Sequence, residues 1–191
     1  MAGGSLIFIS GGVRSGKSSF AERTAAGLAM KSEGKLHYIA AGKAYDPEME
    51  ARIQRHQDYR EKSGLSWTTW EKPSELEEIS GNFNNQDIVL FDCLTTLLNN
   101  ELFRAEDDWR NREFQESLSF DILRAITEIR KNCRYLIVVS NEVLNEPIGK
   151  NELVITYSKI LGTLHRNIVG MADEAYLVEA GIPIQMKGEP E

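Results

Sequence analysis

The sequence of 191 residues contains few cysteines and no long apolar stretch. Its two cysteines, Cys93 and Cys133, are too few for a disulfide framework, and neither has the spacing of a metal ligand. No segment approaches the roughly 20 apolar residues that span a bilayer. The first residues also lack the basic, apolar and small-residue order of a secretory signal. We therefore expect a cytoplasmic protein without a membrane span, with Cys93 as a core residue.

Basic residues are scarce relative to acidic ones. The 22 lysines and arginines are outnumbered by 29 aspartates and glutamates, which gives a formal net charge of −7. Without a positive excess across the domain, we do not expect a nucleic acid as a partner. A hydrophobic fraction of 41% suits one domain, residues 1–191, with a sizeable core.

Short apolar runs rich in branched residues alternate with segments of helical character. This alternation is typical of an α/β protein with a mostly parallel sheet flanked by helices, which binds its ligand at the carboxyl ends of the strands. The expected strands are residues 6–9, 36–40, 88–91 and 135–139, with a further strand around Trp67 and Trp70, and the expected helices are residues 17–31, 47–60, 73–79, 107–131 and 151–171. Two final runs, residues 175–178 and 182–186, predict a C-terminal β-hairpin.

A glycine-rich loop separates the first expected strand from the first expected helix. It matches the pattern G-x-x-x-x-G-K-[ST] in a strand–loop–helix context, whereas an ordinary turn would need only some of these residues. The residues of the match are Gly11, Gly12, Val13, Arg14, Ser15, Gly16, Lys17 and Ser18. Backbone N–H groups of such a loop surround a phosphate, Lys17 reaches the β- and γ-phosphates, and Ser18 holds Mg²⁺. The loop therefore predicts a phosphate-loop (RecA-like) nucleotide-binding fold.

Asp92 follows an expected buried strand in the segment FDC. At that position an acidic residue lies near the phosphate loop and holds Mg²⁺ directly or through water. The alternative is that Asp92 caps the helix expected from Leu94 onward, because aspartate is a preferred N-cap. We favour the magnesium role.

The expected helix 47–60 carries Arg52, His56 and Arg60 at intervals of four residues, so the three lie along one side of it. A neutral imidazole is a nucleophile, and arginines beside it would hold a triphosphate against it. A single histidine on a charged helix is also commonly an ordinary surface residue. From the residues alone, both interpretations stay open.

Six segments occur in an order that resembles a known enzyme family: SGGVRSGKS, EMEARIQRH, WTTWEKP, FDCLTTLLNN, VVSNEV and ADEAYLVEAGIPIQMK. Over nearly the whole chain, the sequence is similar to the bifunctional adenosylcobinamide kinase / adenosylcobinamide-phosphate guanylyltransferase family of cobalamin biosynthesis. The resemblance implies that the protein phosphorylates adenosylcobinamide with ATP or GTP. It then implies transfer of GMP from GTP to that phosphate, with His56 carrying GMP as a phosphoramidate, and a homo-oligomer, expected to be a trimer.

The resemblance also implies the nucleotide contacts outside the loop. They are Ala40, Ala41, Gly42, Arg52, Gln57, Asp58, Tyr59, Arg60, Glu71 and Asp92. Glu71 is suited to accept from the N1–H and N2–H groups of a guanine, although an exposed carboxylate at a strand end needs no ligand. Asn141 and Glu142, at the end of another strand, are further candidates.

The sequence departs from the family pattern at residues 144–149, at Ser158 and Lys159, and at His165 and Arg166. We expect these positions near the corrinoid or a neighbouring subunit. Two other functions remain open: a small-molecule kinase in which His56 has no chemical role, and a non-catalytic sensor that binds GTP to switch a partner surface.

Overall fold

One mixed sheet runs through the middle of the molecule. The computed structural model describes residues 3–32, 34–42, 47–104, 108–143 and 151–189, and for residues 47–49, 52 and 59 only the backbone. Within these residues the strands follow the order β3-β2-β4-β5-β1-β6-β7. They are β1 (Ser5–Gly11), β2 (Leu36–Ala40), β3 (Trp67–Glu71), β4 (Ile88–Asp92), β5 (Tyr135–Asn141), β6 (Glu174–Glu179) and β7 (Ile182–Lys187). All neighbours pair in parallel except β6 and β7, which form the predicted hairpin.

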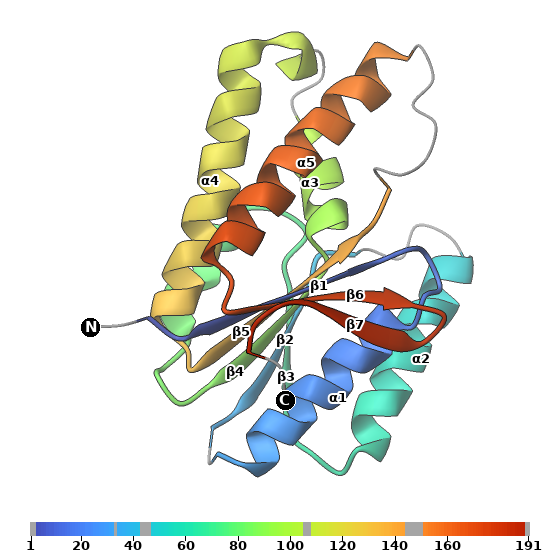
Figure 1. The fold of residues 1–191 in the computed structure, drawn as a ribbon, viewed down its shortest axis with the longest axis vertical. Coiled ribbons are helices and arrows are strands. Elements are labelled where there is room, and N and C mark those ends of the chain that lie inside the picture. Colours follow the sequence, from blue (N-terminus) through green and yellow to red (C-terminus); the bar gives the residue numbers. More distant parts are fainter. Residues whose placement is uncertain (1–2, 33, 43–46, 105–107, 144–150, 190–191) are drawn as a thin grey trace.

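Helices cover both faces of the sheet (Figure 1). One face carries α1 (Lys17–Met30) and α2 (Pro47–Lys62), and the other carries α3 (Leu94–Leu102), α4 (Arg112–Lys131) and α5 (Glu152–Met171). This is the doubly wound arrangement that alternating strands and helices predict. Of the helices in the described ranges, none combines the length and the apolarity needed to cross a membrane.

The core lies in two layers because successive side chains of a strand point to opposite faces of the sheet. On β1, Leu6 and Phe8 pack under α4 and α5, whereas Ile7 and Ile9 pack on the side of α1. On β4, Phe91 is fully buried in the first layer. Each such side chain stabilises the fold by roughly 1.5–3 kcal/mol on burial. Both faces are apolar, which explains why these strands appear in the sequence as continuous runs.

Two helix predictions were wrong in their extent. Residues 73–75 are not helical, and a 3₁₀ helix, η1 (Leu76–Asn82), begins only after Glu75, whose φ of 55° is left-handed. The predicted helix 107–131 is divided into a 3₁₀ turn, η2 (Asp108–Arg110), and α4. The division falls at Asn111, whose side-chain oxygen caps α4 by accepting from the N–H groups of residues 113 and 114. Residue 107 lies outside the described residues.

The departures from the family pattern on α5 are partly core residues. Ser158 and His165 are both 8% exposed, and His165 packs edge-on against Phe8 with its Nε2 2.7 Å from the Ser140 hydroxyl. Burial lowers the pKa of His165. Ser158 and His165 therefore pack within the chain, and the expectation that these positions lie near a corrinoid or a neighbouring subunit stays a prediction. Their neighbours at 159 and 166 are exposed, and residues 144–149 lie outside the described residues.

Candidate functional site

A cleft of about 690 Å³ opens at the carboxyl ends of β2, β3, β4 and β5, between the start of α1 and one side of α2. Parallel strands end at the same edge of the sheet, so residues distant in the sequence meet there. The predicted residues that line this cleft are Lys17, Ser18, Ala40, Gly42, His56, Gln57, Arg60, Glu71 and Asp92, and Asn141 joins them. The phosphate loop and the histidine helix thus border one space.

The loop between β1 and α1 has the geometry of a phosphate-binding loop. Gly16, with φ of 92°, is the N-cap of α1, and the first turn of that helix contains no acidic residue. The positive end of the helix is therefore available to an anion. The Lys17 side chain is buried to 5% exposure, and its Nζ donates to the carbonyl oxygen of Gly12 at 3.1 Å. This bond holds the lysine along the loop, beside the cleft.

The C-terminal hairpin packs against this loop. The N–H of Gly181 donates to the carbonyl oxygen of Ser15 at 2.8 Å. A Cβ at Gly11 would lie 2.4 Å from the carbonyl oxygen of Val178, so only glycine fits there. The first glycine of the motif thus permits a close approach between β1 and β6. Val13, a predicted contact residue of this loop, is 61% exposed, so its side chain lies at the surface.

The other predicted nucleotide contacts are placed as follows. Ala41 is buried, and its N–H donates to the carbonyl oxygen of Asp92, which joins the loops after β2 and β4. Asp58 accepts a hydrogen bond from Gln54 on the same helix. The side chains of Arg52 and Tyr59 lie outside the described part of the structure, and their predicted roles stay predictions.

Asp92 ends β4 and does not cap α3, because the N-cap of that helix is Cys93. One Asp92 oxygen lies 3.3 Å from the Tyr38 hydroxyl, which donates to it. Burial, reinforced by the Asp92 carboxylate, raises the pKa of Tyr38 well above its ordinary value, so the phenol stays protonated. The same two causes raise the pKa of Cys93, which leaves its thiol a poor nucleophile. His56 is therefore better suited than Cys93 to attack an electrophile in the cleft.

His56 and Arg60 both face a buried glutamate on α1. Glu22 Oε1 lies 3.1 Å from Nη1 of Arg60 and 3.3 Å from Nδ1 of His56. The Arg60 guanidinium also stacks on the ring of Tyr38, with its central carbon 3.8 Å from the ring centroid. Arg60 was expected to hold phosphate. In the structure its guanidinium forms an ion pair with Glu22 at the wall of the cleft, and its contact with phosphate stays a prediction.

Sequence reasoning missed Glu22 and Tyr38. Glu22 stands four residues after Ser18 on α1, so helical spacing places the two on the same side of the helix. That spacing was a usable signal, because a carboxylate on the loop-facing side of this helix needs a cation nearby. For Tyr38, in the middle of an apolar strand, no signal distinguished it from a packing residue.

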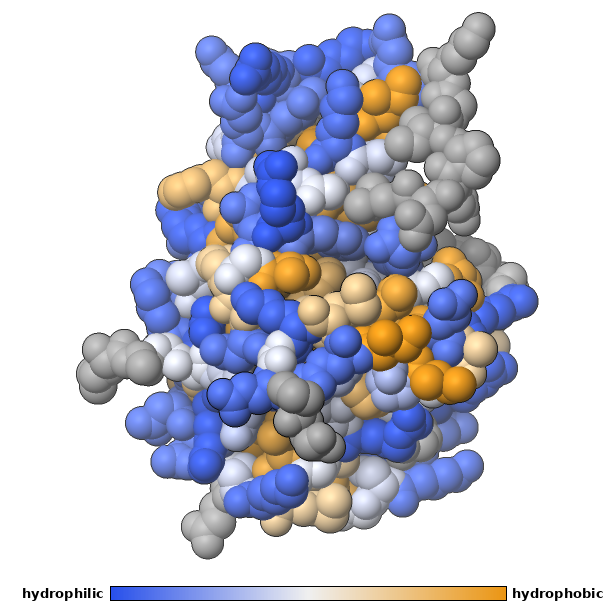
Figure 2. All heavy atoms as spheres, viewed as in Figure 1, coloured by the Kyte–Doolittle hydropathy of each residue, from blue (hydrophilic) through white to orange (hydrophobic). Residues whose placement is uncertain are grey.

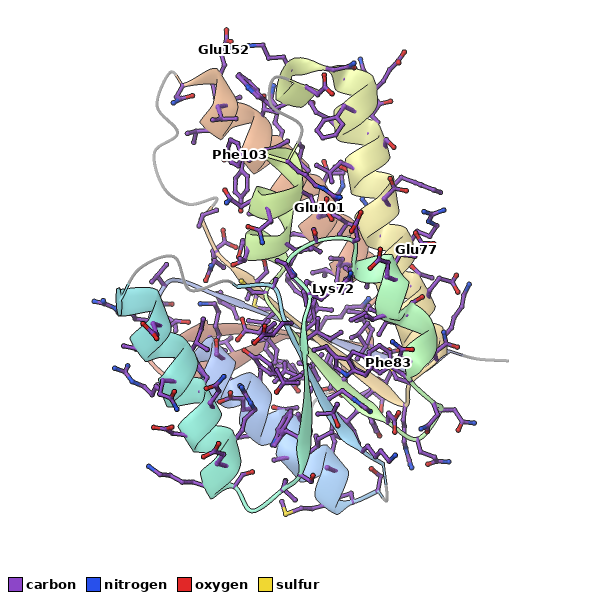
Figure 3. The ribbon with its side chains drawn as sticks, turned by 180° about the vertical axis from the view of Figure 1, so that it is seen from behind. Lys72, Glu77, Phe83, Glu101, Phe103 and Glu152 are labelled. Carbon is purple, nitrogen blue, oxygen red and sulfur yellow. The ribbon has the colours of Figure 1, made fainter. Side chains whose placement is uncertain are left out.

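A second cavity, of about 790 Å³, lies between η1, α3 and α4. Its rim is charged, and Figure 3 shows Glu77 on η1 and Glu101 on α3, from two of these elements. Arg104 and Arg124, also at this cavity, form ion pairs with acidic neighbours there. None of the predicted site residues whose side chains the structure describes lines it.

The sheet, the loop and the cleft together define a nucleotide-binding protein of the phosphate-loop α/β class. The flagellar accessory protein FlaH from Methanocaldococcus jannaschii has a similar solved structure, with a TM-score of 0.51 over 99% of this chain and 80% of that one. At 16% identity this likeness supports the fold alone.

Within that class the chain belongs to the cobinamide kinase / cobinamide phosphate guanyltransferase family, whose model matches residues 7–186. The resemblance inferred from the sequence is thereby confirmed. The bifunctional adenosylcobalamin biosynthesis protein CobP of Pseudomonas aeruginosa is 35% identical, over 95% of this chain and 97% of that protein. CobU of Escherichia coli, described in the same words, is 29% identical over 95% of this chain and 99% of its own length.

Proposed function

We propose that the protein phosphorylates adenosylcobinamide with ATP or GTP and then transfers GMP from GTP to the resulting phosphate, with His56 as the carrier. The observation that supports this proposal best is that His56 lines the same cleft as Lys17, Ser18 and Asp92. A simple kinase needs the last three residues but has no use for a partly exposed imidazole beside them.

In the guanylyl step, a neutral imidazole nitrogen of His56 attacks the α-phosphorus of GTP, and the bond from that phosphorus to the bridging oxygen of pyrophosphate breaks. The histidine must be held in line with the leaving group. Lys17 takes up charge that develops on the pyrophosphate. A phosphate oxygen of the acceptor then attacks the same phosphorus, the N–P bond breaks, and His56 is regenerated.

Mg²⁺ fits the oxygen donors of the cleft. Ser18 and Asp92 both line it, and the described residues include no group of three or more histidine, cysteine and carboxylate side chains placed to hold a metal ion. Mg²⁺ is commonly held by only one or two protein oxygens together with substrate phosphates. We propose that Ser18 and Asp92 hold it, with Tyr38 orienting the Asp92 carboxylate. When bound, Mg²⁺ neutralises charge on the phosphates.

The kinase step uses the same loop with a different acceptor. The backbone N–H groups of the loop, Lys17 and the N-terminus of α1 hold the phosphates while the substrate hydroxyl approaches the γ-phosphorus. Glu71, at the end of β3 on the cleft, is our candidate for guanine recognition, because its two oxygens match the N1–H and N2–H donors of that base.

The test of the function is incubation with α-labelled GTP and Mg²⁺, followed by denaturation and exposure to acid or alkali. We expect wild-type protein to retain label that alkali spares and acid removes, as a phosphoramidate requires. We expect His56→Ala to retain none, while still transferring label from γ-labelled ATP to adenosylcobinamide. Label that persists in His56→Ala would refute His56 as the carrier. A wild type that binds GTP but retains no label would indicate a kinase or a sensor.

We also propose that the protein assembles from identical subunits, with a trimer as the expected form. The surface offers support: apolar side chains gather over the β6–β7 hairpin (Figure 2), where the edge strand exposes Ile182, Ile184 and Met186. Such a stripe on a sheet edge is typical of a covered surface. Light scattering of the purified protein tests this proposal, and a monomeric mass at micromolar concentration would contradict it.

A further inference from the structure

Glu22 is a buried carboxylate in the wall of the cleft, outside every motif considered in the sequence. It is 1% exposed, although glutamate is rarely buried unless it is paired. One carboxylate oxygen, Oε1, contacts both the Arg60 guanidinium and the His56 imidazole. The other, Oε2, is buried and has no hydrogen-bond partner among the residues that the structure describes. The negative charge is therefore concentrated beside the histidine and little screened by water.

The arrangement around this carboxylate is rigid on three sides. Glu22 is fixed by α1, directly after the phosphate loop, while His56 and Arg60 are one turn apart on α2 and project in the same direction. Arg60, 5% exposed, is held from behind by the ring of Tyr38. Of the two partners, only His56 remains partly open, with 25% of its side chain exposed. A contact made solely for stability would need Arg60 but not the histidine.

We propose that Glu22 is a positioning residue for guanylyl transfer: it holds the Nδ1–H of His56 and thereby directs Nε2 to the α-phosphorus of GTP. The proposal rests on His56 as the GMP carrier. The Nδ1–Oε1 separation of 3.3 Å is long for a hydrogen bond, and catalytic contacts of this kind are commonly long before substrate binds. The same logic fixes the tautomer of the histidine in serine hydrolases, where a buried carboxylate faces Nδ1.

The carboxylate also balances the charge of the step. The Nε2 lone pair forms the bond to phosphorus, and the bond between phosphorus and the pyrophosphate oxygen breaks. The proton on Nδ1 stays in place, so the imidazole ring of the guanylylated histidine carries a positive charge that it did not carry before. Glu22 lies against that ring and stabilises this charge as it develops. When the acceptor phosphate displaces the histidine, the ring becomes neutral again and no proton has left Nδ1.

The first test compares wild type with Glu22→Gln, which keeps the shape and an acceptor oxygen but removes the charge. In single-turnover labelling with α-labelled GTP, we expect the rate constant at saturating GTP to fall at least about 100-fold, in keeping with the loss seen when such an orienting carboxylate is neutralised. The GTP concentration for half-saturation should change far less. Glu61→Gln is the matched control, because Glu61 is an exposed residue of α2 and undergoes the same change of charge.

The second test needs no variant. The nitrogen that carries GMP in the wild-type protein can be identified by ³¹P–¹H NMR of the labelled, denatured chain, and we expect Nε2. Linkage through Nδ1 would overturn the proposal even if Glu22→Gln failed to fold, and so would a Glu22→Gln rate constant within about threefold of wild type. In either case the wild type is still labelled, and His56 remains the carrier. Absence of label from the wild type would instead remove the carrier, and the role of Glu22 with it.

Discussion

Replacement of Arg60 by methionine should destabilise the protein strongly, because it leaves the Glu22 carboxylate buried without its cation. Methionine retains an unbranched stem that can pack on Tyr38 and removes only the charged end. At 3.1 Å and an effective dielectric constant near 20, the Coulomb attraction between the two groups is about 5 kcal/mol. Breaking one partner of a buried ion pair typically costs about 3–5 kcal/mol. We therefore expect the free energy of unfolding to fall by about 3–5 kcal/mol.

The assay is urea unfolding of the apo protein, followed by circular dichroism, with thermal unfolding as a second measurement. For a chain of this size, 1 kcal/mol corresponds to about 2–4 °C in Tm, so the expected decrease is roughly 6–20 °C. Arg112→Met is the matched control. Arg112 forms its ion pair with Glu116 on the surface of α4, 2.8 Å apart, and such pairs contribute less than about 0.5 kcal/mol.

The double variant Glu22→Gln/Arg60→Met separates burial of charge from loss of packing. Once the carboxylate is neutral, the buried side chains no longer need a cation, so the double variant should be more stable than Arg60→Met alone. If Arg60→Met lost less than about 1 kcal/mol, or if the losses of the two single variants added in the double variant, the interpretation of Glu22 as a buried charge would be wrong.

Three further predictions concern parts of the molecule away from the cleft. Burial lowers the pKa of His165, so the folded state resists protonation of its ring. The stability that neutral His165 contributes is complete above its unfolded pKa near 6.5 and is lost as the pH falls through its lower folded pKa. Urea unfolding between pH 7 and pH 5 should therefore show a smaller loss of stability in His165→Gln than in wild type. Cys133 is 2% exposed, and burial raises the pKa of its thiol to about 12, so iodoacetamide at pH 8 should leave it unmodified until urea unfolds the chain. Modification without urea would contradict this burial. Gly34→Ala would place a Cβ 1.7 Å from the Gln86 carbonyl oxygen and should lower the free energy of unfolding by more than about 2 kcal/mol. Gly27→Ala, on α1 with open space around its Cβ, should instead stabilise the protein by roughly 0.5–1 kcal/mol. Thermal unfolding measures both changes.

The strands were predictable because the two faces of the sheet are both covered. A run such as β4 carries apolar side chains on each face, and periodicity is then not needed to recognise it. Helix ends were less predictable. The left-handed backbone at Glu75 delays η1, and nothing in the local sequence indicates that conformation. The cap at Asn111 could have been recognised, since asparagine followed by helix-forming residues is a common helix start.

The site was predictable where one short motif contains the chemistry, and not where contact depends on the packing of two helices. The phosphate loop specifies its own geometry, so Lys17 lies where the pattern places it. Arg60 was assigned to phosphate because it lies one turn after His56 on the same side of α2. This spacing does not show which group that side of the helix faces. Which group that side faces is decided by how α2 packs against α1, and this packing brings Glu22 to both residues.

The position of β1 between β5 and β6 has a consequence for the order in which the protein matures. The strand that opens the phosphate loop precedes the other described strands in the sequence, yet its two partners in the sheet, β5 and β6, follow β4. The loop itself rests on the turn of the hairpin at Gly181. Contacts so distant in sequence form late and slow the folding of a domain. A nascent chain therefore exposes the nucleotide motif before the strands that support it are present, and we expect affinity for a nucleotide to appear only after the hairpin has been synthesised.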